Sequence, residues 1–450
     1  MNILVTSENF WQGGLEIHIK TYYENLPENV NVVFAFGNYS GEVSLENAKI
    51  YTGFHFSWVD TAKDFCEDVN RLVKIIEDEK IDVVHAHPYH ALFASLFASQ
   101  ITKVKLVYTY HGISSFNFTK SPNTSAMFYY AFQSGAVGNV FSVNEAGAKV
   151  FADMGYSNSV FLPNSIDLKK FPKATYQNNN KWALLSRLNE DKLDEIKTLI
   201  ANMQLYNMEA IDIYGSGNCE EELKAYVAQM GLEDKVCLKG FTNDVFGTVN
   251  GKYNGIIGIG RVVLEGIITG MPVFLIGFNK LSGFVNTDIY NKLKLLNFSN
   301  LMLDDTNFNM PSREEIASLE ADARNSFGAE ELARQYVEAL NKCSSLHHDN
   351  LCKLYYEIEP LSKLDNDGCL VHKDRRVYDL IQNYIGRFST SVQIDMLLTN
   401  TNASYEVYDR LYKELSVVSD DVQKLNAKSR NIFVRLFRRV KQKCGKNSRN

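Results

Sequence analysis

One glycine-rich stretch combines a backbone turn with a carboxylate. Residues 258–260 (Gly-Ile-Gly) follow an apolar run at 253–257 and open a segment with helical apolar spacing that carries Glu265 on its first turns. A helix N-terminus presents free backbone N–H groups and a positive dipole end, which suits a phosphate. A carboxylate one or two turns further along accepts hydrogen bonds from sugar hydroxyls. The pair predicts a nucleotide-sugar or dinucleotide site, and the alternative is a strand-turn-helix whose glycines serve packing.

Two cations follow a predicted strand at 182–185. Arg187 follows the strand after one residue, and Lys192 opens the next predicted helix. Transfer of a sugar from a nucleoside diphosphate leaves negative charge on the diphosphate, and fixed cations stabilise that charge as the bond breaks. These residues are therefore candidates for the catalytic cations, and the alternative is a surface arginine and a solvated lysine.

Three histidines lie at the carboxyl ends of predicted strands. His85 and His87 share one face of a strand, because the side-chain period of a strand is two. His111 ends the next apolar run and precedes Gly112. No third ligand has the spacing of a metal site, so we interpret His85 and His87 as acceptor-side or packing residues and expect no metal. A structural role is the alternative for His111.

The elements that must position these residues form two successive sets. Apolar strands alternate with amphipathic segments, such as 16–26 and 65–76, and this alternation predicts parallel sheets covered on both faces. A polar run at 175–180 reads as a linker. The first set of strands is 3–6, 31–36, 82–86, 105–109, 140–143 and 160–162, and the second is 182–185, 211–214, 236–238, 256–259 and 273–276.

From about Arg313 the strand signals fade. One helix is predicted at 330–341, and further helices are predicted at 376–388 and 403–425. Residues 403–425 carry apolar side chains at steps of four and three, as in a short coiled-coil seam. This seam is either a contact with a second copy or partner subunit, or a face packed on the rest of the chain.

The last residues form a basic amphipathic segment. Ten Lys or Arg and no acid follow Val422, so the preceding residues carry a formal charge of −16 within a total of −6. A basic amphipathic helix is typical of a membrane surface, and docking on the acidic body or nucleic-acid binding are the alternatives. The candidate membrane-contact residues are Ile432, Phe433, Arg435, Leu436, Phe437, Arg438 and Arg439.

Composition limits the class of protein. The 450 residues, 45% hydrophobic and 22% charged, are ordinary for a soluble enzyme of two or three domains. Seven scattered cysteines without a CxxC pair suggest neither a zinc site nor a disulfide framework. Met1 to Thr6 already reads as a strand and lacks the features of a signal peptide, and no apolar run is long enough to span a bilayer. We therefore expect a cytoplasmic protein whose basic tail contacts the inner membrane face.

Several short motifs, in chain order over residues 1–342, make the sequence resemble the family 4 glycosyltransferases. No single motif is specific, but eight in one order are unlikely to arise by chance. The stretches are Gly13-Gly14-Leu15-Glu16, residues 82–87, residues 108–112, Pro163-Asn164-Ser165-Ile166-Asp167, Ser186-Arg187-Leu188 with Lys192, residues 214–217, Lys239-Gly240-Phe241, and the Glu265 segment.

The resemblance implies a fold and a division of the chain. The family has two Rossmann-like α/β domains facing across a cleft, the GT-B fold. For this chain it implies an acceptor-side domain at 1–172, a nucleotide-sugar-binding domain at 173–342 and a helical extension at 343–450 with the basic tail.

The resemblance also implies roles for single residues. Arg187 and Lys192 would hold the donor diphosphate, Glu265 the ribose hydroxyls, and His111 the transferred sugar. The family's other glutamate falls on Ile257, a departure that leaves the donor sugar open. The remaining donor-side residues would be Gly13, Gly14, Gly215, Gly217, Phe241, Gly260, Arg261 and Val262, and the acceptor-side residues His85, His87 and Asn144.

The chemistry so implied is a retaining, metal-independent transfer without a cofactor. Residues 365–367 (Asp-Asn-Asp) match a metal motif of a different fold, but they lie outside both sheets and read as a polar turn. We therefore expect an enzyme that moves a hexose from a UDP- or GDP-linked donor to a glycan or lipid-linked acceptor, in cell-surface polysaccharide or glycolipid synthesis. We expect no nucleic-acid partner. The alternatives are a nucleotide-sugar epimerase of the same fold and a catalytically weak partner subunit of another transferase.

Overall fold

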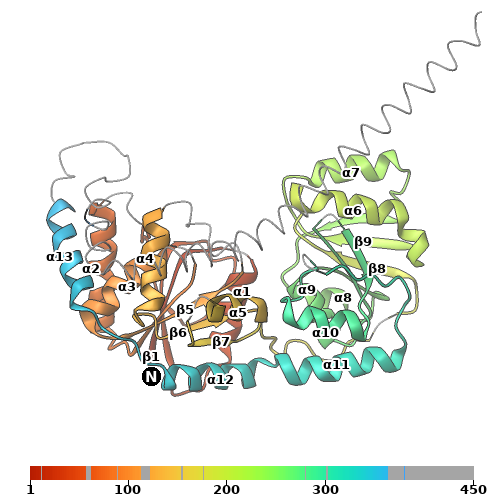
Figure 1. Cartoon of the computed structure of the whole chain (residues 1–450). Coiled ribbons are helices and arrows are strands. Elements are labelled where there is room, and N and C mark those ends of the chain that lie inside the picture. The colour runs from red at the N-terminus through yellow and green to blue at the C-terminus, as the bar shows by residue number, and fades with distance from the viewer. Residues whose placement is uncertain are drawn as a thin grey trace, which may run out of the picture. The chain divides into compact units, whose positions relative to one another are not determined.

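The fold contains two parallel-dominated sheets with the same strand order, seen in a computed structural model (Figure 1). The structure describes residues 1–11, 13–56, 62–88, 90–112, 122–153, 156–175, 177–278, 280–300, 303–362 and 380. The predicted helix at 403–425, the polar turn at 365–367 and the membrane-contact residues of the tail lie outside these residues, as does the predicted helix at 376–388 except for residue 380.

The first sheet has the order β3-β2-β1-β4-β5-β6-β7, with all neighbours parallel. Its strands are β1 (Asn2–Phe10), β2 (Asn31–Tyr39), β3 (Lys49–Tyr51), β4 (Val83–Ala86), β5 (Lys105–Tyr110), β6 (Asn139–Ser142) and β7 (Ser159–Phe161). Its helices are α1 (Gly14–Glu24), α2 (Ala62–Asp78), α3 (Ala91–Thr102), α4 (Pro122–Gln133) and α5 (Glu145–Asp153). The order reverses between β1 and β4, the point where open α/β sheets bind ligands.

Both faces of the first sheet are covered, as the alternation of strands and helices predicted. Neighbouring residues of β1 point to opposite faces. The hydroxyl of Thr6 forms a 2.9 Å hydrogen bond with that of Ser95 on α3, whereas Val5 joins a core cluster with residues of α1 and of α12 (Ala329–Lys342). Figure 1 shows α13 (Asp349–Ser362) beside α2 and α3, with which it is in contact.

The second sheet has the order β10-β9-β8-β11-β12-β13 and repeats the reversal between β8 and β11. Its strands are β8 (Lys181–Leu185), β9 (Ala210–Tyr214), β10 (Val236–Gly240), β11 (Gly255–Gly258), β12 (Val273–Gly277) and β13 (Lys280–Phe284). Its helices are α6 (Glu190–Asn202), η2 (Met203–Tyr206, a 3-10 helix), α7 (Glu220–Gln229), α8 (Val245–Val249), α9 (Arg261–Ile268), α10 (Thr287–Leu295) and α11 (Arg313–Phe327).

The strands predicted from apolar runs are all present, and the described residues contain two further strands that were not predicted. The missed β3 is three residues long, and the missed β13 is an antiparallel edge strand with a glycine at φ 87°. Short or glycine-containing edge strands lack the long apolar runs of buried parallel strands. The predicted α/β fold with two Rossmann-like domains and a helical C-terminal part is confirmed.

The connection between the two sheets is tightly packed. Ile166 is fully buried in a core cluster of the second sheet and exchanges backbone hydrogen bonds with Phe327 and Ala329. The start of the predicted linker at 175–180 is hydrogen-bonded to the second domain, because the N–H of Thr175 donates to Asn250 Oδ1 at 2.9 Å. Helix α12, which follows the second sheet in the sequence, packs into the core of the first sheet. The domain boundaries at 172 and 342 stay a prediction.

Candidate functional site

The carboxyl ends of β8, β9, β11 and β12 bring together most of the predicted donor-side residues. A glycine with φ 64°, Gly260, precedes α9 and forms the predicted turn before the helix that carries Glu265. Two loops approach each other closely here, since a Cβ atom on Gly215 would collide with the carbonyl oxygen of Ser186, and one on Gly217 with that of Leu188. These glycines let the loop after β9 lie against the loop after β8, at the switch point of the sheet.

The two predicted cations have different surroundings. Arg187 is exposed two residues after the end of β8, and its side chain has no hydrogen bond or ion pair among the described residues. Lys192 lies in the first turn of α6 with its side chain 11% exposed. Its ammonium is 3.4 Å from Asp191 Oδ2 and 3.9 Å from Glu195 Oε1. Arg187 is thus available to an anion in solution, whereas Lys192 is held within the protein.

Glu265 is buried and already has a cationic partner. Arg261 Nε donates to Glu265 Oε1 at 2.8 Å, Nη1 donates to the carbonyl oxygen of Ser165 at 2.9 Å, and Nη2 donates to the hydroxyl of Thr21 at 3.2 Å. Burial raises the pKa of Glu265 and the nearby guanidinium opposes that rise. Burial lowers the pKa of Arg261, opposed by the carboxylate. The pair is therefore an ion pair with little water around it.

Ile257, at the position where the family has its other glutamate, points into the protein. Its side chain is fully buried in the apolar core between the second sheet and α6. It therefore offers no polar group to a ligand. Val262 is half-buried beside Gly258, and Phe241, after β10, is 52% exposed.

The first sheet gathers four histidines at the carboxyl ends of β4 and β5 and on α1. His87 Nδ1 and His111 Nε2 are hydrogen-bonded at 2.9 Å, and the rings of His85 and His87 are 4.3 Å apart. His18 on α1 completes the group, with its ring 4.9 Å from that of His111 and its Nδ1 2.9 Å from Asn164 Oδ1. The three histidines predicted from the strands are thus brought together, and the sequence analysis missed His18.

Burial keeps these four rings neutral. Desolvation lowers the pKa of His18 to about 4 and that of His85 to about 3. It also lowers the pKa of His87 and of His111 well below the ordinary value, and charges on the neighbouring rings add to the effect. A neutral imidazole has one donor and one acceptor nitrogen, so the group can hydrogen-bond hydroxyls without attracting an anion.

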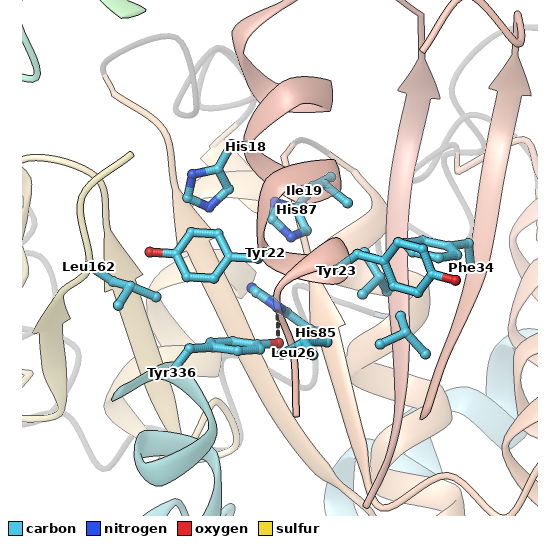
Figure 2. Close-up of a pocket in the computed structure, with 12 residues that line it drawn as sticks. His18, Ile19, Tyr22, Tyr23, Leu26, Phe34, His85, His87, Leu162 and Tyr336 are labelled. Atoms are coloured by element: carbon cyan, nitrogen blue, oxygen red, sulfur yellow. Dashed lines mark hydrogen bonds between the residues drawn. The ribbon is translucent and has the colours of Figure 1, made fainter. Parts of the chain in front are cut away.

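A small cavity lies beneath the histidines, between α1, the first sheet and α12 (Figure 2). Its volume of about 30 Å³ has room for about two water molecules. Tyr336 of α12 faces it, and its hydroxyl is hydrogen-bonded to His85 Nδ1 at 2.7 Å, while His85 Nε2 is hydrogen-bonded to the Thr109 hydroxyl at 2.6 Å. Both nitrogens of His85 are thereby used within the protein, which favours the packing interpretation of this residue over the acceptor-side one.

Three more predicted residues take structural positions. Gly13 precedes α1, where the side chain of Glu16 folds back, accepts the N–H of Trp11 at 3.2 Å and fills the space beside the glycine. The exposed Gly14 begins the helix. Asn144 Oδ1 accepts the N–H of Gly147 at 2.6 Å, as an N-cap of α5 does.

The described part of the chain contains no group of three or more His, Cys, Asp or Glu side chains arranged to hold a metal ion. None of the helices in that part combines the length and the apolar character that crossing a lipid bilayer requires.

Comparison with known proteins identifies relatives of both sequence and fold. The family described as Glycosyltransferase Family 4 matches residues 12–170. No curated protein matches the chain. Residues 12–170 cover most of the first sheet, so the resemblance proposed from the motifs is confirmed there by sequence.

Solved structures extend the similarity over both sheets. A glycosyltransferase from Rickettsia africae is 15% identical with a TM-score of 0.57, over 76% of this chain and 98% of its own. HepE from Anabaena, in complex with UDP, is 18% identical with a TM-score of 0.57, over 76% and 100%. The lipopolysaccharide outer core galactosyltransferase WaaB is 13% identical with a TM-score of 0.52, over 76% and 99%. At these identities the similarity shows the fold, which is GT-B.

Proposed function

From this resemblance to family 4 glycosyltransferases and this GT-B fold, we propose that the protein transfers a hexose from a nucleoside-diphosphate sugar to a glycan or lipid-linked acceptor. The observation that carries the proposal is the contrast between the two switch points. Arg187, Lys192 and the Glu265 turn gather at the second sheet, and neutral histidines gather at the first. An anionic diphosphate suits the former and an uncharged sugar suits the latter. HepE from Anabaena, which has the same fold, was solved with UDP-glucose.

The proposed chemistry uses the cations for the leaving group. Arg187 and Lys192 stabilise the charge that develops on the diphosphate as its bond to the sugar breaks. His111 hydrogen-bonds the transferred sugar, held in place by its bond to His87. We propose a retaining transfer without a metal ion, in which the leaving diphosphate assists the acceptor hydroxyl, and a role in cell-surface polysaccharide or glycolipid synthesis.

Donor binding and turnover test this function. A thermal-shift panel of UDP- and GDP-linked hexoses should identify one donor that raises the melting temperature, and the purified protein should then hydrolyse that donor slowly without acceptor. His111→Ala should lower the turnover number more than it raises the Michaelis constant for the donor, because its contact strengthens in the transition state. If no nucleotide sugar stabilises the protein, the proposal is wrong.

A catalytically weak partner subunit is the second candidate. It is favoured by the buried Ile257, which removes a polar group from the donor side, and by Arg261, which occupies the carboxylate of Glu265. Such a subunit would bind the donor but neither hydrolyse nor transfer it. Binding without turnover in the panel above would select this candidate.

We also propose that the basic tail brings the enzyme to an anionic membrane surface. Each Lys or Arg near such a surface contributes about 1 kcal/mol, and the ten after Val422 make binding measurable even if half take part. Removing residues 426–450 should abolish sedimentation with vesicles of phosphatidylglycerol and phosphatidylcholine at low salt and leave turnover of a soluble acceptor unchanged. If the full chain does not sediment with these vesicles, the membrane proposal is wrong, and docking of the tail on the acidic remainder of the chain is favoured instead.

A further inference from the structure

An aromatic side chain with an unusual backbone conformation lies at the donor-side edge of the second sheet. Phe278 directly follows β12, has φ 51° and is 42% exposed. A bulky residue in the left-handed region is uncommon, because its Cβ crowds the following carbonyl oxygen. Backbone strain of this kind persists where the surrounding structure imposes it, often at functional sites. Burial in the core does not account for it here, since much of the ring is in contact with solvent.

The ring has a cation above it. Lys192 Nζ lies 4.7 Å from the centroid of the Phe278 ring, within the range of a cation–π interaction. Two carboxylates, those of Asp191 and Glu195, also lie near this ammonium. A lysine ammonium on its flexible four-carbon stem has many positions open to it, and the ring limits them.

We propose that Phe278 is a positioning residue that holds the Lys192 ammonium where it meets the diphosphate of the donor. The inference rests on the proposed function, in which Arg187 and Lys192 bind that diphosphate. A ring suits this task because it attracts the ammonium through its quadrupole and leaves the positive charge intact. A third carboxylate in its place would add further negative charge beside the lysine and repel the ligand.

The first test needs no nucleotide. The rate at which an amine-reactive reagent modifies Lys192, measured by peptide mass spectrometry, should rise in Phe278→Leu and return to the wild-type rate in Phe278→Tyr, which restores the ring. Phe308→Leu is the matched control, since Phe308 is 45% exposed and stacks on Tyr206 without a cation. An unchanged rate in Phe278→Leu would overturn the inference, whatever the protein binds.

The second test measures UDP affinity by calorimetry. Phe278→Leu should weaken UDP binding about two- to fivefold, the effect of one partly exposed cation–π contact, and Phe278→Tyr should not. In the Lys192→Met background, Phe278→Leu should have no further effect, because the ring acts through the lysine. Additive losses would show instead that the ring contacts the ligand directly, which contradicts the inference. If wild-type protein binds no UDP, GDP or nucleotide sugar, the proposed function fails, while the modification rates still decide the role of the ring.

A third variant separates positioning from support of the fold. Phe278→Gly relaxes the left-handed backbone, so its melting temperature should equal or exceed that of the wild type while its UDP affinity falls as in Phe278→Leu. A lower melting temperature, with unchanged modification of Lys192, would show that Phe278 is structural.

Discussion

The two sheets share a strand order and differ in the groups at their carboxyl edges. In the first sheet, four histidines, three of them buried and His111 half-buried, are neutral and hydrogen-bonded to one another or to Asn164, Thr109 and Tyr336. In the second, charges remain: an exposed Arg187, an enclosed Lys192 and the Arg261–Glu265 ion pair. One topology thus supports a neutral surface and a charged surface, and the side chains at the switch points decide which ligand each sheet suits.

The contrast predicts that acid destabilises the first sheet. No histidine occurs in residues 173–342. Burial lowers the pKa of His18 from 6.5 to about 4, so between these values the unfolded chain binds a proton that the folded chain does not. Stability is therefore full above pH 6.5 and falls as the pH approaches 4, by about 3 kcal/mol for His18 alone. His85, whose pKa is lowered to about 3, adds a loss in the same direction.

Urea unfolding followed by circular dichroism at pH 7, 5 and 4 measures this loss. A His18→Gln variant should show a flatter pH dependence than the wild type, because glutamine does not titrate in this range. If the two proteins lose equal free energy of unfolding between pH 7 and 4, His18 is not held neutral in the folded state.

Removing one partner of the charged pair gives the next largest expected effect. Glu265→Ala leaves the buried guanidinium of Arg261 without its carboxylate, and breaking a buried pair in this way costs about 3–5 kcal/mol of stability. UDP affinity should fall as well if the carboxylate also accepts hydrogen bonds from the ribose hydroxyls. Replacing both residues, Arg261→Met with Glu265→Gln, should recover stability but not UDP affinity.

Inorganic pyrophosphate provides the control for Glu265. A ribose contact predicts that Glu265→Gln weakens UDP and leaves pyrophosphate binding nearly unchanged. Equal losses for both ligands would mean that Glu265 supports the fold and has no part in nucleotide recognition.

Arg187→Ala should give the opposite pattern, a loss of binding without a loss of stability. The side chain is exposed and has no described partner, so the melting temperature of the ligand-free protein should stay constant. A charge-assisted hydrogen bond to phosphate contributes about 1.5–3 kcal/mol, so UDP affinity should fall at least tenfold in calorimetry. If the variant binds both UDP and GDP with the affinity of the wild type, Arg187 does not bind the donor diphosphate.

Site residues that stand next to an apolar run could be predicted from the sequence, whereas site residues defined by a partner far away in the sequence could not. His85, His87, His111 and Arg187 were found because each follows an apolar run, and strand ends of a parallel sheet meet at one edge. His18 lies on a helix face without such a signal, and its partner Asn164 is 146 residues away.

The partners of Arg261 and Tyr336 could not be predicted from the sequence for the same reason, because they are far away along the chain. Arg261 and Glu265 are four residues apart and so share a helix face, but no local pattern shows that the arginine also reaches the Ser165 carbonyl and the Thr21 hydroxyl. Tyr336 was predicted to be helical, yet its bond to His85 spans 251 residues. Such contacts follow from how α12 packs on the first sheet, which no local pattern encodes.

The smallest expected effect separates the two hydroxyls that hold His85. Tyr336 lines the cavity beneath the histidines, and Thr109 does not. After Tyr336→Phe, a water molecule in the cavity can replace the lost hydroxyl as partner of Nδ1, so stability should fall by only about 0.5–1 kcal/mol. Thr109→Val removes the partner of Nε2 on the side away from Tyr336, and an unsatisfied nitrogen there should cost about 1–3 kcal/mol. Urea unfolding of the two variants at pH 7 measures the difference. A larger loss for Tyr336→Phe than for Thr109→Val would mean that the cavity is dry, and that the neutral surface of the first sheet depends on α12 rather than on its own strands.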